Sequence, residues 1–323
     1  MRSVLRLRHP TDADTERAIE VKTFPLQYTM ASAAGQMSFH LPKAVAFEGN
    51  PVLVGTKDQE FAGQDPTYIS VLPTQGVLPD PIDAFYAYVA THDGSQIWLA
   101  TAPHPLGPWT WREATLELSA TSFRSHISSP SVVAHDGEIW MYYHGVHPAG
   151  TQPTALATST DGVHFVERIF PVMNAHTNRK NHWYGQSVSY VRVVKDGPMF
   201  IGTFQGNGLG ENAQAKGVTT VAGLAMSEDG INWRLSKRPL LGNTPSSRGP
   251  FASTLVHLWN RWLMLYNDDR GLSGSLSETS DVTGPYEDLG RVLESGHWPF
   301  PVFHEGKLYL LCAGINAYVI DWQ

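Results

Sequence analysis

The chain of 323 residues has little of several features that define large classes of protein. Its one cysteine, Cys312, leaves no partner for a disulfide within the chain. Charged residues make up only 16%, and the basic ones form no patch with interleaved aromatics, which argues against nucleic-acid binding. No apolar run approaches the roughly 20 residues that a membrane-spanning helix needs. The N-terminal segment also lacks the apolar run of a signal peptide, so we expect a soluble, cytoplasmic protein that binds no membrane.

Long amphipathic helical patterns are absent too, whereas Gly (29) and Pro (22) are plentiful, which favours an all-β chain rich in turns. Five segments repeat one pattern, which consists of an apolar strand, a tight turn and an aromatic-rich strand. They are residues 44–56, 129–145, 187–204, 253–268 and 300–314. Strand repeats of this length predict a five-bladed β-propeller, with four-stranded antiparallel blades around a central channel.

The second half of each unit repeats as well. Asp161-Gly162 and Asp229-Gly230 mark turns in blades two and three, and Gly107-Pro108 and Gly284-Pro285 mark those in blades one and four. Glycine suits these tight turns because it accepts positive φ. We expect the aromatic residue after each turn to pack between blades, and we assign these motifs a structural role. These aromatic residues are Phe165, Trp233, Trp109 and Tyr286.

The repeat runs almost from end to end, which predicts a single domain over residues 1–323. Residues 1–38 are interpreted as an N-terminal extension. Its segment Val4–Arg8 is expected to pair with the last blade, because an open ring would leave sheet edges unpaired. Residues 57–82, rich in Pro, Gly and Asp, are interpreted as an insertion in blade one.

Histidines recur where the inner strands are expected to begin. In a propeller these positions open onto one face of the channel, where ligands bind. Four of the five positions carry a histidine, namely His40, His126, His182 and His297, and the other carries Arg248. Three interpretations stay open: ligands of a transition metal, a general acid or base working with a carboxylate, or hydrogen-bonded rim residues. The helical spacing of common zinc motifs is absent.

Aromatic and polar side chains near the same face are candidates for binding a sugar or another flat ligand. Trp183, Tyr184 and Trp298 are suited to stacking, and packing across the channel mouth is the equal alternative. Gln186 and Arg248 complete the predicted substrate-binding set, with Arg248 placed to engage an anionic group.

The blade pattern resembles the five-bladed propeller glycosidases, above all glycoside hydrolase family 43. The resemblance rests on the strand units, on the turn APHPLGPW and most closely on SGHWPFPVFHEGKLYLL, and it covers roughly residues 40–316. It implies a glycosidase with a carbohydrate ligand. In that family the histidine of the last-blade segment helps hold a calcium or sodium ion through waters, a role that would fall on His297.

The resemblance further implies three carboxylates on inner strands, and here the chain departs from the family. The aligned residues are Leu41 or His40, then Ser129, then Tyr184, and none is acidic. Glycoside hydrolysis commonly needs a pair of carboxylates beside the scissile bond. The fold can therefore be inherited without the usual mechanism, and Asp83 in the segment LPDPID is a candidate replacement.

Three functional hypotheses follow. The first is a glycosidase-like enzyme with a histidine-rich site, in which His126 or His182 protonates the leaving group and Asp83 activates water. The second is a metal-dependent enzyme acting on a small metabolite, with a divalent metal held by His40, His126, His182 and His297. The third is a carbohydrate-binding propeller without catalysis.

Overall fold

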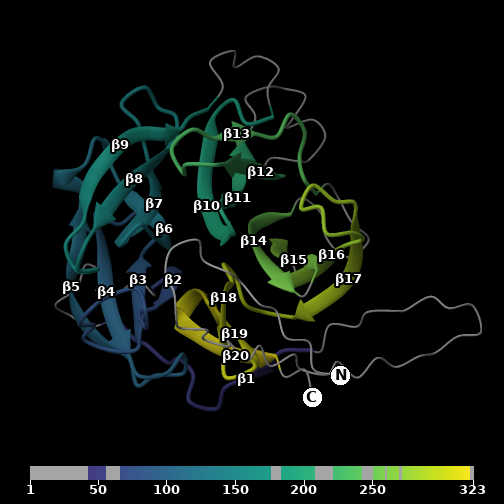
Figure 1. Ribbon diagram of the computed structural model, residues 1–323, viewed down its shortest axis with the longest axis horizontal. Helices are drawn as coiled ribbons and strands as arrows, with labels where there is room; N and C mark the ends of the chain where they lie inside the picture. The colour runs from purple at the N-terminus through teal and green to yellow at the C-terminus, as the bar shows by residue number, and fades with distance from the viewer. Residues whose placement is uncertain are drawn as a thin grey trace, which may run out of the picture. The chain divides into compact units, whose positions relative to one another are not determined.

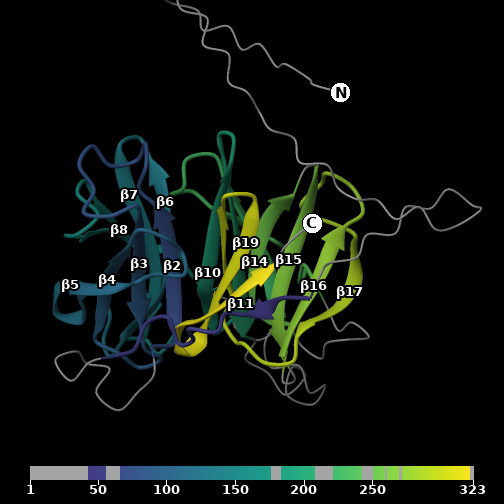
Figure 2. The same cartoon turned by 90° about the horizontal axis from the view of Figure 1, so that it is seen from below.

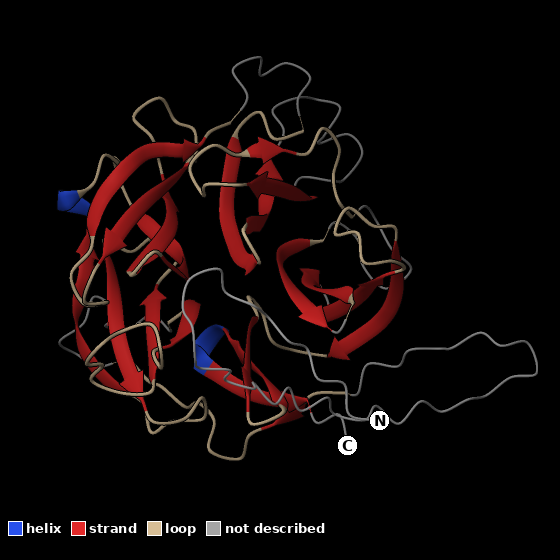
Figure 3. Ribbon diagram, viewed as in Figure 1, coloured by secondary structure: helices blue, strands red, loops and turns tan. Residues whose placement is uncertain are grey.

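The computed structural model describes residues 43–55, 66–175, 183–207, 221–241, 250–258, 260–268 and 271–320. The propeller lies in one compact unit, residues 40–321. Its described strands form five sheets of four strands, arranged in a ring (Figure 1). The prediction of an all-β, five-bladed propeller is confirmed. Apart from two short 3-10 turns, Leu118–Ala120 and Ala313–Ile315, the regular structure described is strand (Figure 3). No helix in these ranges is long and apolar enough to cross a membrane.

Each blade is an antiparallel sheet whose first-named strand lies nearest the centre. Blade one contains β2 (Tyr68–Pro73), β3 (Phe85–Ala90), β4 (Gln96–Ala102) and β5 (Thr110–Glu117). Blade two contains β6 (Ile127–His135), β7 (Glu138–Gly145), β8 (Thr154–Ser159) and β9 (Val166–Met173). Blade three contains β10 (Ser187–Asp196), β11 (Met199–Asn207), β12 (Val221–Ser227) and β13 (Arg234–Leu235). Blade four contains β14 (Phe251–Leu258), β15 (Arg261–Asp268), β16 (Gly271–Ser277) and β17 (Tyr286–Leu293). Blade five contains β18 (Phe300–His304), β19 (Lys307–Cys312), β20 (Asn316–Ile320) and β1 (Val45–Ala46).

The last blade is completed by β1, which pairs with β20. The Asn50 side chain reinforces this seam, because its Nδ2 donates to the Ala317 carbonyl at 2.8 Å and its Oδ1 accepts the Ala317 N–H at 2.7 Å. The fourth strand of this blade is therefore residues 45–46. The closing segment expected from the sequence, Val4–Arg8, lies outside the described residues.

Blade one begins later than the repeat pattern suggested. Its innermost strand is β2, which pairs with β3 in unbroken register. The sequence analysis placed this strand within residues 44–56 and interpreted residues 57–82 as an insertion, and both assignments are corrected. The earlier segment mimics a blade because it has apolar runs on both sides of a turn, yet its Val45 and Val54 are 67% and 61% exposed.

Apolar side chains fill the space between neighbouring blades. The cluster between blades one and two includes Tyr88, Ile97, Tyr143 and Phe165. Similar clusters join blade five to one, two to three, and three to four. Each sheet is thus covered on both faces, which explains the almost continuous burial of β3, β7 and β15.

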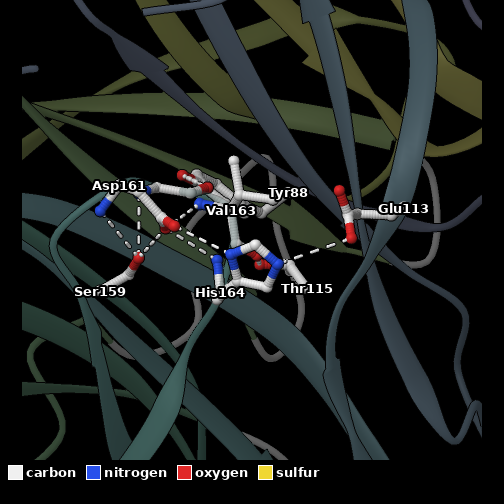
Figure 4. A network of polar contacts seen from close by, with 8 residues as sticks. Tyr88, Glu113, Thr115, Ser159, Asp161, Val163 and His164 are labelled. Atoms are coloured by element: carbon white, nitrogen blue, oxygen red, sulfur yellow. Dashed lines mark hydrogen bonds and ion pairs between the residues drawn. The ribbon is translucent and has the colours of Figure 1, made fainter. Parts of the chain in front are cut away.

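The Asp-Gly turns have the structural role predicted for them. In blade two, Asp161 Oδ1 accepts the N–H groups of Val163 and His164 at 2.8 and 2.9 Å, and Oδ2 lies 2.8 Å from His164 Nδ1 (Figure 4). The Tyr88 hydroxyl of blade one donates to the Gly162 carbonyl at 2.8 Å. Gly162 has a φ of 74°, where glycine carries no penalty. The turn therefore connects two blades.

Blade three repeats the same arrangement. Asp229 Oδ1 accepts the N–H groups of Ile231 and Asn232 at 2.9 and 2.7 Å, and the Asn232 side chain takes the place of the imidazole. The Tyr142 hydroxyl of blade two donates to the Gly230 carbonyl at 2.9 Å. Equivalent residues in successive blades thus make equivalent contacts.

Candidate functional site at the channel mouth

The strands run between two faces of the propeller (Figure 2), and the face at which the inner strands begin is called the mouth. In β6, β10 and β14 a bulge interrupts the register, and its first residue has positive φ: Ser129 at 55°, Tyr190 at 51° and Ala252 at 49°. Trp298, at 58°, occupies the same place before β18. Because bulges re-aim side chains, these four positions are equivalent and face the mouth.

Hydrogen bonds between inner strands identify the fifth equivalent residue. Ser131 Oγ accepts a backbone N–H from β10 at 2.9 Å, and Ser70 Oγ accepts one from β6 at 3.0 Å. Ser70 therefore corresponds to Ser131, and Tyr68, two residues earlier, corresponds to Ser129.

None of these equivalent positions is acidic. Applied to the three carboxylate places that the resemblance implies, the blade equivalence keeps Ser129 at the second. It moves the first place from residues 40–41 to Tyr68 and the third from Tyr184 to Tyr190. The alignment made from the sequence is corrected at these two places, but its conclusion that acids are missing there is unchanged.

Aromatic rings meet at the centre of the mouth, and Tyr68, Tyr190, Trp298 and Phe251 are here called the aromatic layer. The rings of Tyr190 and Trp298 stack at 4.7 Å with an interplanar angle of 24°. Tyr68 packs edge-on against Trp298 at 4.7 Å, and Phe251 lies 5.6 Å from the same indole. Asn267 Oδ1 accepts the Trp298 N–H at 2.8 Å and so fixes the last-blade segment. Tyr68 is buried, whereas Trp298 and Phe251 are partly exposed.

A carboxylate, an imidazole and a phenol form a chain beside this layer. Asp93 Oδ1 lies 3.2 Å from His92 Nδ1, and His92 Nε2 lies 3.3 Å from the Tyr190 hydroxyl. His92 and Asp93 follow β3 and are 60% and 75% exposed. Burial raises the pKa of Tyr190, so its hydroxyl stays protonated near neutral pH. The arrangement can pass a proton between solvent and the centre of the mouth.

Two further imidazoles lie on the other side of Tyr190. The His144 ring is 4.3 Å from the Tyr190 ring and 5.8 Å from the His126 ring. Burial lowers the pKa of His126, an effect that the charge of Asp93 partly offsets, and burial lowers the pKa of His144 further. Both imidazoles are therefore neutral near pH 7.

A buried arginine lies two residues further from the mouth than Tyr190. Arg192 is 5% exposed, its Nη1 donates to the Pro130 carbonyl, and its guanidinium lies 5.6 Å from the Phe300 ring centre. Its Nη2 has no hydrogen-bond partner within the described ranges. Arg192 thus extends from blade three toward blades two and five.

The sequence-predicted stacking residues of blade three pack within the blade instead. Trp183 stacks on Phe204 at 5.4 Å and donates its indole N–H to the Lys237 carbonyl at 3.2 Å. Tyr184 is buried edge-on against the same phenylalanine. Gln186 is exposed just before β10. Of the predicted substrate-binding residues, Trp298 lies in the aromatic layer, and Arg248 lies outside the described residues.

Asp83 lies at the opposite end of blade one from the mouth. Its Oδ1 accepts the Ala84 N–H at 3.2 Å, and Thr74 Oγ1 donates to its carbonyl at 2.6 Å, beside the end of β2. The five residue steps of β2, at ~3.3 Å each, put this end about 17 Å from Tyr68. The structure therefore does not bring Asp83 and His126 together.

The predicted metal ligands fare differently. His40 and His182 lie outside the described residues, and His297 is exposed. Within the described part of the chain, one group has potential ligand atoms close enough to share an ion: His104, His304 and Glu305. This group lies where β4 and β18 end, on the face opposite the mouth. The metal prediction for His126 and His297 stays a prediction.

The sequence analysis missed Tyr68, His92, Asp93, Tyr190 and Arg192. Counting back from each inner-strand turn would have found Tyr190, because the bulge positions are at a fixed offset from these turns. Arg192 carried a second signal, since a lone cation among the apolar residues of SYVRVV is unusual for an inner strand.

No protein-family model and no curated protein matches the sequence. Solved structures match the fold. A glycoside hydrolase family 43 enzyme from Xanthomonas citri, complexed with xylose, has a TM-score of 0.60 and 14% identity over 86% of this chain and 89% of its own. A family 43 β-xylosidase/α-arabinofuranosidase from a compost metagenome, complexed with xylotriose, has a TM-score of 0.59, 13% identity, and 83% and 88% coverage. A family 32 β-fructofuranosidase from Bombyx mori has a TM-score of 0.56 and 13% identity over 76% of this chain and 53% of its own. The chain thus has the fold of these propeller glycosidases.

Proposed function

We propose that the chain is a glycosidase-like, carbohydrate-active protein that binds sugar at the mouth and uses a histidine-rich proton-transfer site. The observation that carries this proposal is the Asp93–His92–Tyr190 chain, which ends at the aromatic layer. Aromatic faces suit the apolar faces of sugar rings. The fold shared with family 43 and family 32 enzymes, and the xylose and xylotriose bound to two of them, support a carbohydrate ligand.

The proposed acid is Tyr190. Its protonated hydroxyl donates to the leaving-group oxygen, and His92, held by Asp93, supplies the replacement proton. His126 is the proposed base toward water, because a buried, neutral imidazole has a free lone pair for the proton. The masked His182 remains a candidate from the sequence alone. Asp83 is left out because it lies at the far end of β2.

Hydrolysis of a panel of aryl glycosides tests this proposal. We expect Tyr190→Phe and His92→Gln each to lower kcat by a factor of about 10² to 10⁴, the usual contribution of a general acid or base. His164→Gln is the matched control, since His164 is also an imidazole beside a carboxylate but belongs to a blade turn. Full activity in Tyr190→Phe would rule out the proposed acid.

A second candidate is a carbohydrate-binding propeller without catalysis. It is favoured by the five equivalent mouth positions, none of which carries an acid. Calorimetric titration with oligosaccharides separates the two candidates. Binding that Trp298→Ala removes, with no turnover of any bound sugar, supports the second candidate and contradicts the first.

A further inference from the structure

Arg192 presents an unusual balance of charge inside the channel. A buried guanidinium is normally paired with a carboxylate, because an unpaired buried charge is costly. Here the described contacts of Arg192 are the Pro130 carbonyl and the Phe300 ring, both uncharged. The carboxylate of Asp93 is 75% exposed and is engaged by His92. Within the described chain, the positive charge therefore has no compensating negative one.

The groups around Arg192 also offer more donors than acceptors. His144 Nδ1 accepts the Tyr190 N–H at 3.4 Å, so the proton of the neutral ring lies on Nε2. That Nε2, the Tyr68 hydroxyl and Arg192 Nη2 are all buried without a hydrogen-bond partner in the described residues. Tyr68 and His144 flank the Tyr190 ring on the mouth side of Arg192, and both lie within range of the charge of Arg192. Three donors thus lack an acceptor in one region.

We propose that this region, bounded by Arg192, Tyr68 and His144, binds a small monovalent anion of the size of a halide ion or a carboxylate group. The anion accepts from Arg192 Nη2, the Tyr68 hydroxyl and His144 Nε2, and it neutralises the guanidinium. It has two possible sources: a free anion held in the channel, or the carboxylate of an acidic sugar seated at the mouth. The site depends on none of the residues assigned to proton transfer, so it stands even if the protein is not a glycosidase.

Thermal unfolding at constant ionic strength tests the site. Chloride, acetate and galacturonate replace a bulky sulfonate one at a time, with galactose as the neutral partner of galacturonate. At about 100 times its Kd, a bound anion is expected to raise Tm by roughly 5 °C, because it binds only the folded state. Stabilisation by chloride and acetate identifies a free anion. Stabilisation by galacturonate alone, without galactose, identifies the sugar carboxylate. Absence of any anion effect overturns the proposal.

Variants tie the effect to Arg192. We expect Arg192→Met to abolish the anion-dependent rise in Tm, whereas Arg168→Met retains it, because Arg168 is an exposed partner of Glu138. An unchanged anion response in Arg192→Met contradicts the proposal. Arg192→Lys keeps the charge and loses the fork of N–H donors. If Arg192→Met does not fold, Arg192→Lys decides: weaker anion binding by calorimetry supports the site, and unchanged affinity overturns it.

Discussion

The Asp-Gly turns and the channel mouth are built from the same repeat but differ in how completely their polar groups are bonded. Asp161 and Asp229 make matching hydrogen bonds in blades two and three, and a tyrosine of the preceding blade closes each turn. At the mouth, buried polar atoms of Tyr68, Ser129 and Arg192 have no partner within the described ranges.

The difference separates the residues that build the propeller from those available for a ligand. Turn residues are alike from blade to blade because each must make the same contact with its neighbour. The five equivalent mouth positions instead carry Tyr, Ser, Tyr, Ala and Trp. A buried polar group without a partner costs stability, so its presence is best explained by a ligand or by water. Four predictions test this contrast.

The largest effect is expected from Asn267, the mouth residue whose side chain is fully bonded. It accepts the Trp298 N–H at 2.8 Å and donates to the carbonyls of Gly296 and Gly271 at 2.8 and 3.2 Å. We expect Asn267→Ala to lower the free energy of unfolding by about 2 to 4 kcal/mol, because it leaves buried groups unpaired. Urea denaturation measures this. Asn232→Ala, in an exposed turn, is the control, and an equal effect of the two changes would remove the contrast.

A smaller loss is expected from a turn. Asp229→Ala removes the acceptor for the Ile231 and Asn232 N–H groups. The expected destabilisation is about 1 to 2 kcal/mol, similar to the loss of a helix cap. Asp161→Ala should behave alike in the same denaturation assay. A large difference between these twin turns would show that the blades are not energetically equivalent.

The two regions should also respond to acid at different pH. Backbone and side-chain hydrogen bonds from Asn232 hold the pKa of Asp229 well below its usual range. Its stabilisation is therefore present above about pH 4 and is lost as pH falls further. Burial lowers the pKa of His144 and His126, so the unfolded chain binds protons first and stability declines as pH falls below about 6.5.

Unfolding free energies measured from pH 7 to pH 3 separate these contributions. His144→Gln should flatten the upper part of the profile, and Asp229→Asn the lower part. If His144→Gln leaves the slope between pH 5 and pH 7 unchanged, the buried imidazole does not titrate as described.

The smallest effect concerns metal. We expect added Zn²⁺ to bind weakly at His104, His304 and Glu305, because His104 Nδ1 already accepts the Leu106 N–H at 3.0 Å. Calorimetric titration should show this binding lost in His304→Ala and retained in His297→Ala. The reverse result would place the metal at the mouth and revive the multi-histidine hypothesis.

Much of the fold follows from local signals in the sequence. The strand-turn-strand repeat gives five blades, and Asp-Gly followed by an aromatic gives the inter-blade turns. The repeat misplaced blade one, because residues 44–56 have the apolar pattern without the burial.

The candidate site was less accessible from the sequence. Trp298 and His126 were found because they adjoin inner strands. Tyr68 and Tyr190 were missed because their convergence depends on the bulge register, which is a long-range property of paired strands. His92 was missed because it follows β3, the second strand of blade one, and only the folded blade brings it to Tyr190.

The seam between β1 and β20 joins the earliest and latest described strands through two residue pairs and the Asn50 side chain. Since Val45 is 67% exposed, little apolar burial protects these backbone amides from solvent. Hydrogen–deuterium exchange should therefore begin at Ala317–Val319 long before it reaches the inner strands, and fraying at this seam is the expected first step when the propeller unfolds.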